Sequence, residues 1–214
     1  HNLLLKMECE NVYAPLRGVP PSICVDVGGH VGHTAAQMAS FGHEVHVFEP
    51  FQGNLVQLRE AVKQYPKVHV YQGAVSTKAG FLRFQVSGIL ENDANVVKGD
   101  ESYAARKGTS AVGSAGAMGC VKGSPGCVES FNLDELFPTQ ELLMLKIDVQ
   151  GGEEAVLNGA KDLIESRRIK YIYFEVSGQR LVNASLDLLE AAGYMCFDHA
   201  GVWPFEKETF RPQS

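Results

Sequence analysis

A glycine-rich segment between a short apolar run and a helical pattern holds the residues best suited to bind a ligand. It reads Val25-Asp26-Val27-Gly28-Gly29-His30-Val31-Gly32-His33-Thr34. Glycines at a strand-to-helix turn let the backbone approach a ligand closely and leave the first helical N–H groups free. The spacing is not the dinucleotide fingerprint, because His30 stands where its second glycine would be. Asp26 would repel a pyrophosphate and attract an ammonium group, which favours a cofactor that carries an amino acid.

A second acid, Glu49, ends the next apolar run and precedes Pro50. A carboxylate there, about 20 residues beyond the glycines, can accept both hydroxyls of a ribose. Pro50 lacks an N–H and fixes φ, so it ends the strand and helps to aim the carboxylate. A glycine turn with an acid after each of two strands indicates S-adenosylmethionine, whose adenine is expected near residues 73–76. The predicted cofactor-binding residues are Asp26, Gly28, Gly29, His30, Gly32, Glu49, Pro50 and Ala74.

Three further acids and a lysine are the candidate catalytic residues: Asp148, Glu153, Glu175 and Lys146. An acceptor group that carries a proton needs that proton removed or strongly hydrogen-bonded before it can act as a nucleophile, and Asp148 is the predicted base. Acids that converge at a sheet edge could raise one another's pKa or hold a divalent cation. Alternatively, Glu153 could complement a helix dipole and Glu175 could pair with a basic residue. Lys146 could orient Asp148 or the acceptor oxygen, or could extend to water.

The two histidines of the glycine-rich segment do not predict a metal site. His30 and His33 have the i, i+3 spacing of paired ligands. No third ligand stands at a matching spacing, so no metal site is predicted there.

Short apolar runs alternate with helical patterns along most of the chain. Strands are expected at residues 23–27, 45–48, 68–75, 142–149 and 171–176, and helices at residues 35–41, 55–62, 153–164 and 181–192. This alternation predicts an α/β fold, doubly wound, with a mostly parallel sheet and helices on both faces. Ligands bind such sheets at the carboxyl ends of the strands, near the point where strand order reverses. The closely spaced runs 194–198 and 203–210 predict an antiparallel C-terminal hairpin.

Residues 87–129 interrupt the alternation with a glycine-rich insertion. A loop of this length is either a lid over a site or a surface insertion without a role. The flanking runs 81–86 and 127–131 could pair as a hairpin. Of five cysteines, only Cys120 and Cys127 could bridge, because the stretch between them is flexible, and reduced thiols are the default expectation.

The amino-acid composition indicates a globular domain and argues against several other classes of protein. The chain has 214 residues, 45% apolar and 21% charged, with a formal net charge of −6. These values are typical of a globular domain and argue against a dedicated nucleic-acid-binding surface. Apolar runs are too short to span a bilayer. We expect an N-terminal extension over residues 1–21 and one domain over 22–210. Because the chain starts at His1, an upstream targeting segment could be missing, and a cytoplasmic location is only the default.

Several motifs in order resemble the FkbM family of class I methyltransferases. They are residues 25–32, the Glu-Pro-Phe-x-x-Asn pattern within 47–54, Asn132-Leu133-Asp134-Glu135-Leu136, the run 145–153, Val156-Leu157-x-Gly159-Ala160, and Tyr173-Phe174-Glu175-Val176. The resemblance covers about residues 22–200. It implies a Rossmann-like fold with seven strands, S-adenosylmethionine as cofactor, and O-methylation of a hydroxyl, often on a sugar or small metabolite. The family usually has Asn in place of His30 and Glu in place of Gln150, and the second difference removes a charge beside the presumed acceptor site.

Two other functions remain open at this point. An oxidoreductase that uses NAD is one, because Glu49 could bind its ribose, although Asp26 and His30 speak against it. A non-catalytic module that keeps the methyltransferase fold is the other, motivated by Gln150 and the insertion. The expected partner is a small-molecule or glycan acceptor. No interleaving of basic and aromatic residues indicates a nucleic acid, and the oligomeric state is not determined.

Overall fold

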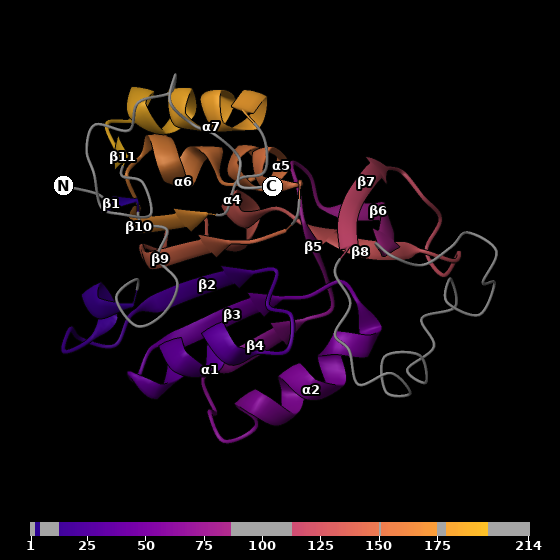
Figure 1. Ribbon diagram of the computed structural model, residues 1–214, viewed down its shortest axis with the longest axis horizontal. Coiled ribbons are helices and arrows are strands. Elements are labelled where there is room, and N and C mark those ends of the chain that lie inside the picture. Colours follow the sequence, from indigo (N-terminus) through magenta and orange to yellow (C-terminus); the bar gives the residue numbers. More distant parts are fainter. Residues whose placement is uncertain (1–2, 5–12, 87–112, 150, 175–178, 197–214) are drawn as a thin grey trace.

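The computed structural model describes residues 3–4, 13–86, 113–149, 151–174 and 179–196. Its centre is a sheet of five strands in the order β10-β9-β2-β3-β4, and all neighbours are parallel (Figure 1). The strands are β2 (Ile23–Val27), β3 (Glu44–Phe48), β4 (Val68–Tyr71), β9 (Leu142–Ile147) and β10 (Ile169–Phe174). The predicted α/β class with a mostly parallel sheet is therefore confirmed.

Helices cover both faces of this sheet (Figure 1). One face carries α1 (His33–Ser40) and α2 (Gln52–Val62). The other carries α4 (Leu133–Leu136), α5 (Glu153–Asn158), α6 (Lys161–Glu165) and α7 (Gln179–Ala191). Every residue of β9 is buried as a result, which explains why its sequence is a nearly unbroken apolar run.

Strand order reverses beside β2. From β2 the chain moves through α1, β3 and α2 to β4, and later returns to place β9 on the other side of β2. The residues that follow β2 and β9 therefore diverge and leave a crevice between them. In open α/β sheets such a crevice is the usual position of a ligand.

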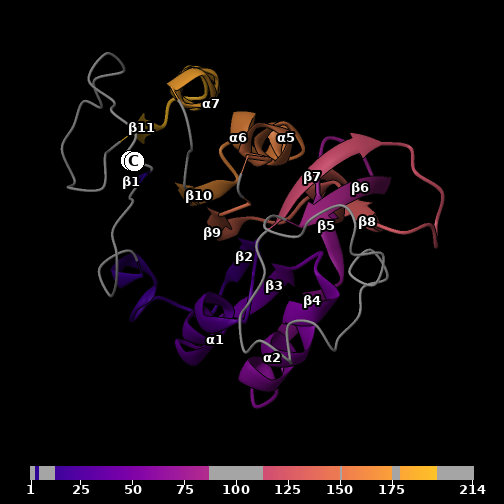
Figure 2. The same ribbon diagram turned by 45° about the vertical axis from the view of Figure 1, so that its right-hand side comes forward.

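A second sheet of four strands stands beside the first (Figure 2). Its order is β5-β8-β6-β7, with bounds Gly73–Val75, Cys127–Phe131, Gly80–Val86 and Gly113–Met118. The expected pairing of 81–86 with 127–131 is confirmed, because β6 and β8 are antiparallel. Cys120 and Cys127 form a disulfide, so the default expectation of reduced thiols was wrong for this pair.

Two predicted elements are divided in the structure. Residues 68–75 form β4 and β5, in different sheets, rather than one strand. The break precedes Gly73, where a Cβ would lie 2.5 Å from the carbonyl oxygen of Glu129, so the chain crosses close to β8 there. Residues 153–164 form α5 and α6 rather than one helix. They part at Gly159, where a Cβ would lie 2.2 Å from the carbonyl oxygen of Ser76.

The ends of the domain are described only in part. The main sheet has five strands among the described residues, and seven strands in one sheet are not confirmed. Strand β11 (Met195–Cys196) pairs in parallel with β1 (Leu3–Leu4), and residues 203–210 of the expected hairpin lie outside the described part. A short 3₁₀ helix spans Ala14–Leu16. Of the helices that the structure describes, none is both long and apolar enough to cross a membrane.

Candidate functional site

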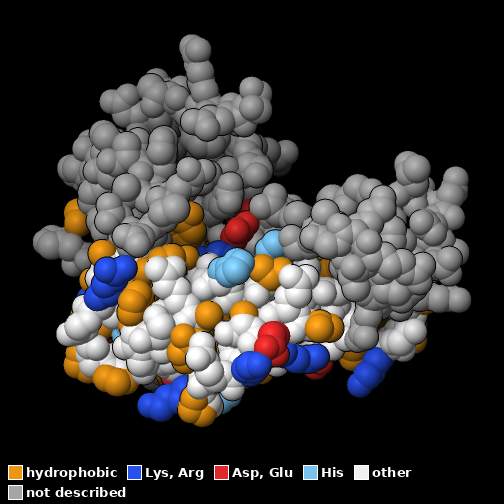
Figure 3. Space-filling model, turned by 60° about the horizontal axis from the view of Figure 1, so that its bottom comes forward, with side chains coloured by type: hydrophobic (Ala, Val, Ile, Leu, Met, Phe, Trp, Pro, Cys, Tyr) orange, Lys and Arg blue, Asp and Glu red, His pale blue; other side chains and the backbone are white. Residues whose placement is uncertain are grey.

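A cavity of about 340 Å³ lies where β2, β3 and β9 end. Its walls come from the turn after β2, the end of β3, strand β5 and the end of β9; they include Val27, Gly28, Phe48, Glu49, Ala74, Lys146 and Asp148. This is the crevice at the reversal of strand order. Figure 3 shows histidine, acidic and basic side chains close together on one face of the molecule. The cavity is large enough for a cofactor or a small organic ligand.

The turn after β2 depends on its glycines. Gly28 has φ of +83° and a Cβ there would lie 1.9 Å from the carbonyl oxygen of Asp148. Gly29 is equally restricted, since a Cβ would lie 2.2 Å from Cγ2 of Val47. His30 has φ of +50°, a left-handed conformation in which Asn, Asp and His are enriched. The sequence thus fixes a tight turn whose backbone forms one wall of the cavity.

Glu49 joins this turn to the end of β3. Its Oε2 accepts a bond from the backbone N–H of His30 at 2.8 Å. Its Oε1 accepts from the N–H of Phe51 at 2.8 Å and from Nδ2 of Asn54 at 3.3 Å. The side chain lines the cavity although the residue is only 5% exposed. Burial raises the pKa of Glu49 to about 7, and the bonds from Phe51 and His30 oppose that rise.

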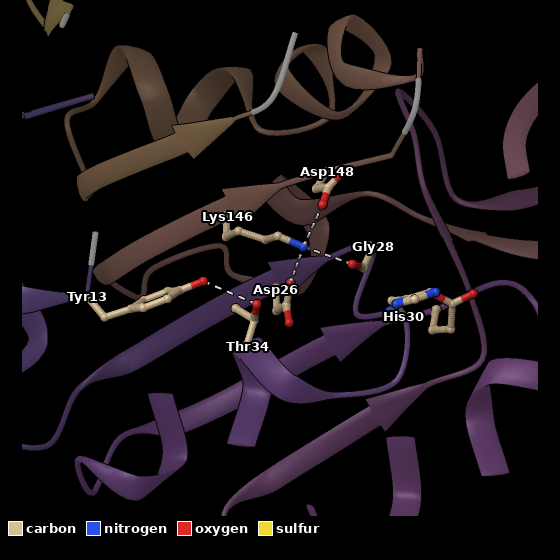
Figure 4. Close-up of polar contacts among 8 residues, drawn as sticks. Tyr13, Asp26, Gly28, His30, Thr34, Lys146 and Asp148 are labelled. Atoms are coloured by element: carbon tan, nitrogen blue, oxygen red, sulfur yellow. Dashed lines mark hydrogen bonds and ion pairs between the residues drawn. The ribbon is translucent and has the colours of Figure 1, made fainter. Parts of the chain in front are cut away.

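Lys146 lies between two acids at the opposite wall (Figure 4). Its Nζ is 3.0 Å from Oδ1 of Asp26 and 3.7 Å from Oδ2 of Asp148, and it donates to the carbonyl oxygen of Gly28 at 2.9 Å. Burial lowers the pKa of Lys146, but Asp26 and Asp148 outweigh it, so the net shift is upward. Lys146 is therefore an ammonium. Burial raises the pKa of the completely buried Asp26, the ammonium opposes that rise, and the two residues form an ion pair.

The side chain of His30 offers an open hydrogen-bonding position. Its Nε2 is buried and has no hydrogen-bond partner among the residues that the structure describes. Burial lowers the pKa of His30, so the ring is neutral near pH 7. The residue lines the cavity. A buried polar atom without a partner is costly, and a ligand that bonds to it would remove that cost.

Most of the residues predicted to bind a cofactor lie together. Those that line the cavity are Gly28, Gly29, His30, Glu49, Pro50 and Ala74, whereas Asp26 and Gly32 do not line it. Asp26 lies behind Lys146, with its charge compensated from inside the protein. Gly32, with φ of +90°, is the N-cap of α1. The ligand contacts of all eight remain predictions.

The predicted catalytic residues are more dispersed. Asp148 and Lys146 line the cavity. Glu153 is 1% exposed and does not line it; its Oε1 accepts from the N–H of Gly151 at 2.9 Å. That bond lies at the start of α5, and the two roles considered for Glu153 stay predictions. Glu175 lies outside the described residues, as does Gln150.

Some residues that line the cavity were not predicted from the sequence. Asn54 lines the cavity and holds Glu49, and its signal was present in the Glu-Pro-Phe-x-x-Asn pattern. Thr34 also lines it, and its Oγ1 is 3.2 Å from the hydroxyl of Tyr13 in the N-terminal extension. Phe84 comes from β6 in the second sheet. Nothing in the local sequence around Phe84 indicates that it reaches this site.

One family model matches most of the chain. Residues 26–196 match the model of the family described as Methyltransferase FkbM domain. Among solved structures, the chain is similar to methyltransferase FkbM from Methylobacillus flagellatus KT, with 16% identity and a TM-score of 0.45 over 71% of this chain and 32% of that one. It is also similar to precorrin-6y C5,15-methyltransferase from Geobacter metallireducens GS-15, with 13% identity and a TM-score of 0.44 over 85% and 68% of the two chains. The chain thus spans 32% of the length of the first structure. A search of the curated proteins gave no match.

Proposed function

Because the chain belongs to the FkbM methyltransferase family, we propose that it binds S-adenosylmethionine in the cavity at the ends of β2, β3 and β9 and methylates a hydroxyl on a sugar or small metabolite. The observation that supports this proposal most directly is the placement of Glu49. Its buried carboxylate lines the cavity and is held by bonds from His30, Phe51 and Asn54. A carboxylate fixed at the end of the second parallel strand suits the two hydroxyls of a ribose.

The remaining walls fit the other parts of this cofactor. Gly73 and Ala74 expose strand backbone and little side chain, which suits the flat adenine. Lys146 is cationic and suits the carboxylate of the amino-acid part, and the unpartnered Nε2 of His30 can bond to the same part. Asp26 acts through Lys146 in this arrangement, because it lies behind the ammonium rather than at the cavity wall.

Asp148 is the residue proposed to handle the proton of the acceptor. When bound, S-adenosylmethionine supplies a reactive methyl group, so the protein has mainly to align the acceptor oxygen and exclude water. The carboxylate of Asp148 lies at the end of β9 with its side chain 35% exposed, and it can accept a proton from a hydroxyl in the cavity. The ammonium of Lys146 lies 3.7 Å from this carboxylate and attracts it electrostatically.

A methyl-transfer assay tests the proposal. Methyl-labelled S-adenosylmethionine is incubated with the protein and a panel of sugars and hydroxylated metabolites. Asp148→Asn should lower turnover by about 10²- to 10⁴-fold, the usual contribution of general base catalysis, with a much smaller change in cofactor affinity. Glu154→Gln is the matched control, because Glu154 is exposed at the start of α5 and does not line the cavity. Label transfer to no hydroxyl in the panel, or full activity in Asp148→Asn, would refute this mechanism.

A further inference from the structure

A second group of polar side chains lies on strands β3 and β4, and none of it lines the cavity. Glu44 and His46 stand two residues apart on β3, and His69 is the direct neighbour of His46 on β4. The alternate residues Val45 and Val47 pack in the core with α1 and α2. Because successive side chains of a strand point to opposite faces, Glu44 and His46 share the other face of the sheet.

The three side chains converge on one point. Oε1 of Glu44 lies 3.1 Å from Nε2 of His46 and 3.2 Å from Nε2 of His69. One potential ligand atom from each residue lies within 4.8 Å of the other two. The His46 side chain is 13% exposed, whereas those of Glu44 and His69 are 41% and 47% exposed. The group is therefore anchored on its inner side and open to an ion from solvent.

We propose that Glu44, His46 and His69 bind a divalent transition-metal ion of the zinc class, with water completing the coordination. Two imidazoles and one carboxylate with an open fourth position form a common zinc ligand set. Metal–ligand bonds of about 2.0–2.1 Å in tetrahedral geometry place ligand atoms roughly 3.4 Å apart, close to the separations of 3.1 and 3.2 Å between Glu44 and the two histidines. Nitrogen ligands favour zinc, nickel or copper over magnesium, which prefers oxygen.

The surroundings of His46 strengthen this assignment. Its Nδ1 is 3.0 Å from the hydroxyl of Tyr71, the type of outer contact that fixes the ring of a metal-binding histidine. When Nδ1 donates to that hydroxyl, the lone pair of His46 lies on Nε2, toward Glu44. The ring of His46 also packs edge-on against Phe137, with centroids 4.9 Å apart.

A bound ion would join two strands at the border of the main sheet. Among the described residues β4 pairs with β3 alone in this sheet, so it forms one edge. The ligands come from both strands, and the ion would hold this edge in register. Since the site forms only in the folded protein, zinc should raise the melting temperature.

Zinc titration of the metal-free protein against a chromogenic chelator tests the proposal. Wild type should bind one equivalent that excess Mg²⁺ does not displace. His69→Ala should lose this binding, and Tyr71→Phe should weaken it by about 10-fold, as is typical when an outer partner of a ligand is removed. His69 is nearly half exposed, so its replacement should leave the fold intact. Glu60→Ala is the control, because Glu60 is an exposed carboxylate on α2 that does not line the cavity.

Each outcome decides between an ion site and a merely hydrogen-bonded cluster. Zinc should raise the melting temperature of wild type and of Glu60→Ala, and leave that of His69→Ala unchanged. Absence of stoichiometric zinc binding by the wild type would overturn the proposal. So would equal zinc affinity in His69→Ala and Glu60→Ala, because the ion would then be held elsewhere.

Discussion

The ammonium nitrogen of Lys146 lies 3.0 Å from a carboxylate oxygen of Asp26, and both residues are almost entirely buried. From sequence alone, Asp26 was expected to attract the ammonium group of a cofactor. In the structure the protein supplies that ammonium itself. The same nitrogen donates to the carbonyl oxygen of Gly28, so the ion pair holds the turn that forms the cavity wall.

This pair should be important for stability. Lys146→Met leaves the carboxylate of Asp26 buried without a compensating charge, and loss of one partner of a buried pair costs about 3–5 kcal/mol. Adding Asp26→Asn removes the orphaned charge and should recover part of that loss. Urea unfolding of the two single variants and the double variant measures the coupling. Equal instability of Lys146→Met and the double variant would contradict the ion-pair assignment.

The turn after β2 should tolerate no side chain at Gly28. Gly28 and Gly42 have similar φ, +83° and +91°, but an added Cβ meets the Asp148 backbone only at Gly28. Gly42→Ala therefore measures backbone strain alone, about 1–2 kcal/mol. Gly28→Ala should cost at least about 2 kcal/mol more, because overpacking is added. Similar unfolding free energies for the two variants would show that the turn is looser than described.

Glu49 should make stability depend on pH. Burial raises the pKa of Glu49 to about 7 from an ordinary value of 4.5, so the folded protein binds this proton more tightly than the unfolded chain. The resulting stabilisation is present below pH 4.5 and is lost as pH rises toward 7. Relative to Glu49→Gln, wild type should therefore lose on the order of 3 kcal/mol between pH 4.5 and 8. Parallel stability curves for the two proteins would contradict the raised pKa.

The disulfide between Cys120 and Cys127 should stabilise the second sheet. It closes a short loop, with a sequence separation of 7, directly before β8. Closure of a loop of this size contributes about 2.5 kcal/mol in the chain-entropy description. Dithiothreitol should lower the melting temperature of wild type and leave that of the Cys120→Ser/Cys127→Ser variant unchanged. An equal effect on both proteins would show that the bond does not contribute.

Local patterns were sufficient for much of the fold. The strands at residues 23–27 and 45–48, and the helices after them, follow from apolar runs with clear periodicity and glycine or proline boundaries. Gly193, two residues beyond the end of α7, has the left-handed φ of +82° that is common after a helix. The separate starts of β5 and α6 were not predicted. Close contacts of Gly73 and Gly159 with backbone that is distant in the sequence determine where these elements begin.

In the site as well, local sequence patterns predict some features, and contacts between distant residues determine the others. Gly28 and Glu49 could be placed at one cavity because parallel strands bring their carboxyl ends together. The pairing of Asp26 with Lys146 joins residues from two strands far apart in the chain, and no periodicity encodes it. The cluster on β3 and β4 was missed for the same reason, since His69 faces His46 only through the register of the sheet.

The most direct test of the central claim is calorimetric titration of the protein with S-adenosylhomocysteine at pH 8. Wild type should bind it, and Glu49→Ala should bind about 100-fold more weakly, because two hydrogen bonds to a charged group are lost. Glu49→Gln should fall between them, and Glu60→Ala, an exposed change on α2, should match wild type. Absence of binding by the wild type at high micromolar ligand, or wild-type affinity in Glu49→Ala, would contradict the assignment of this cavity.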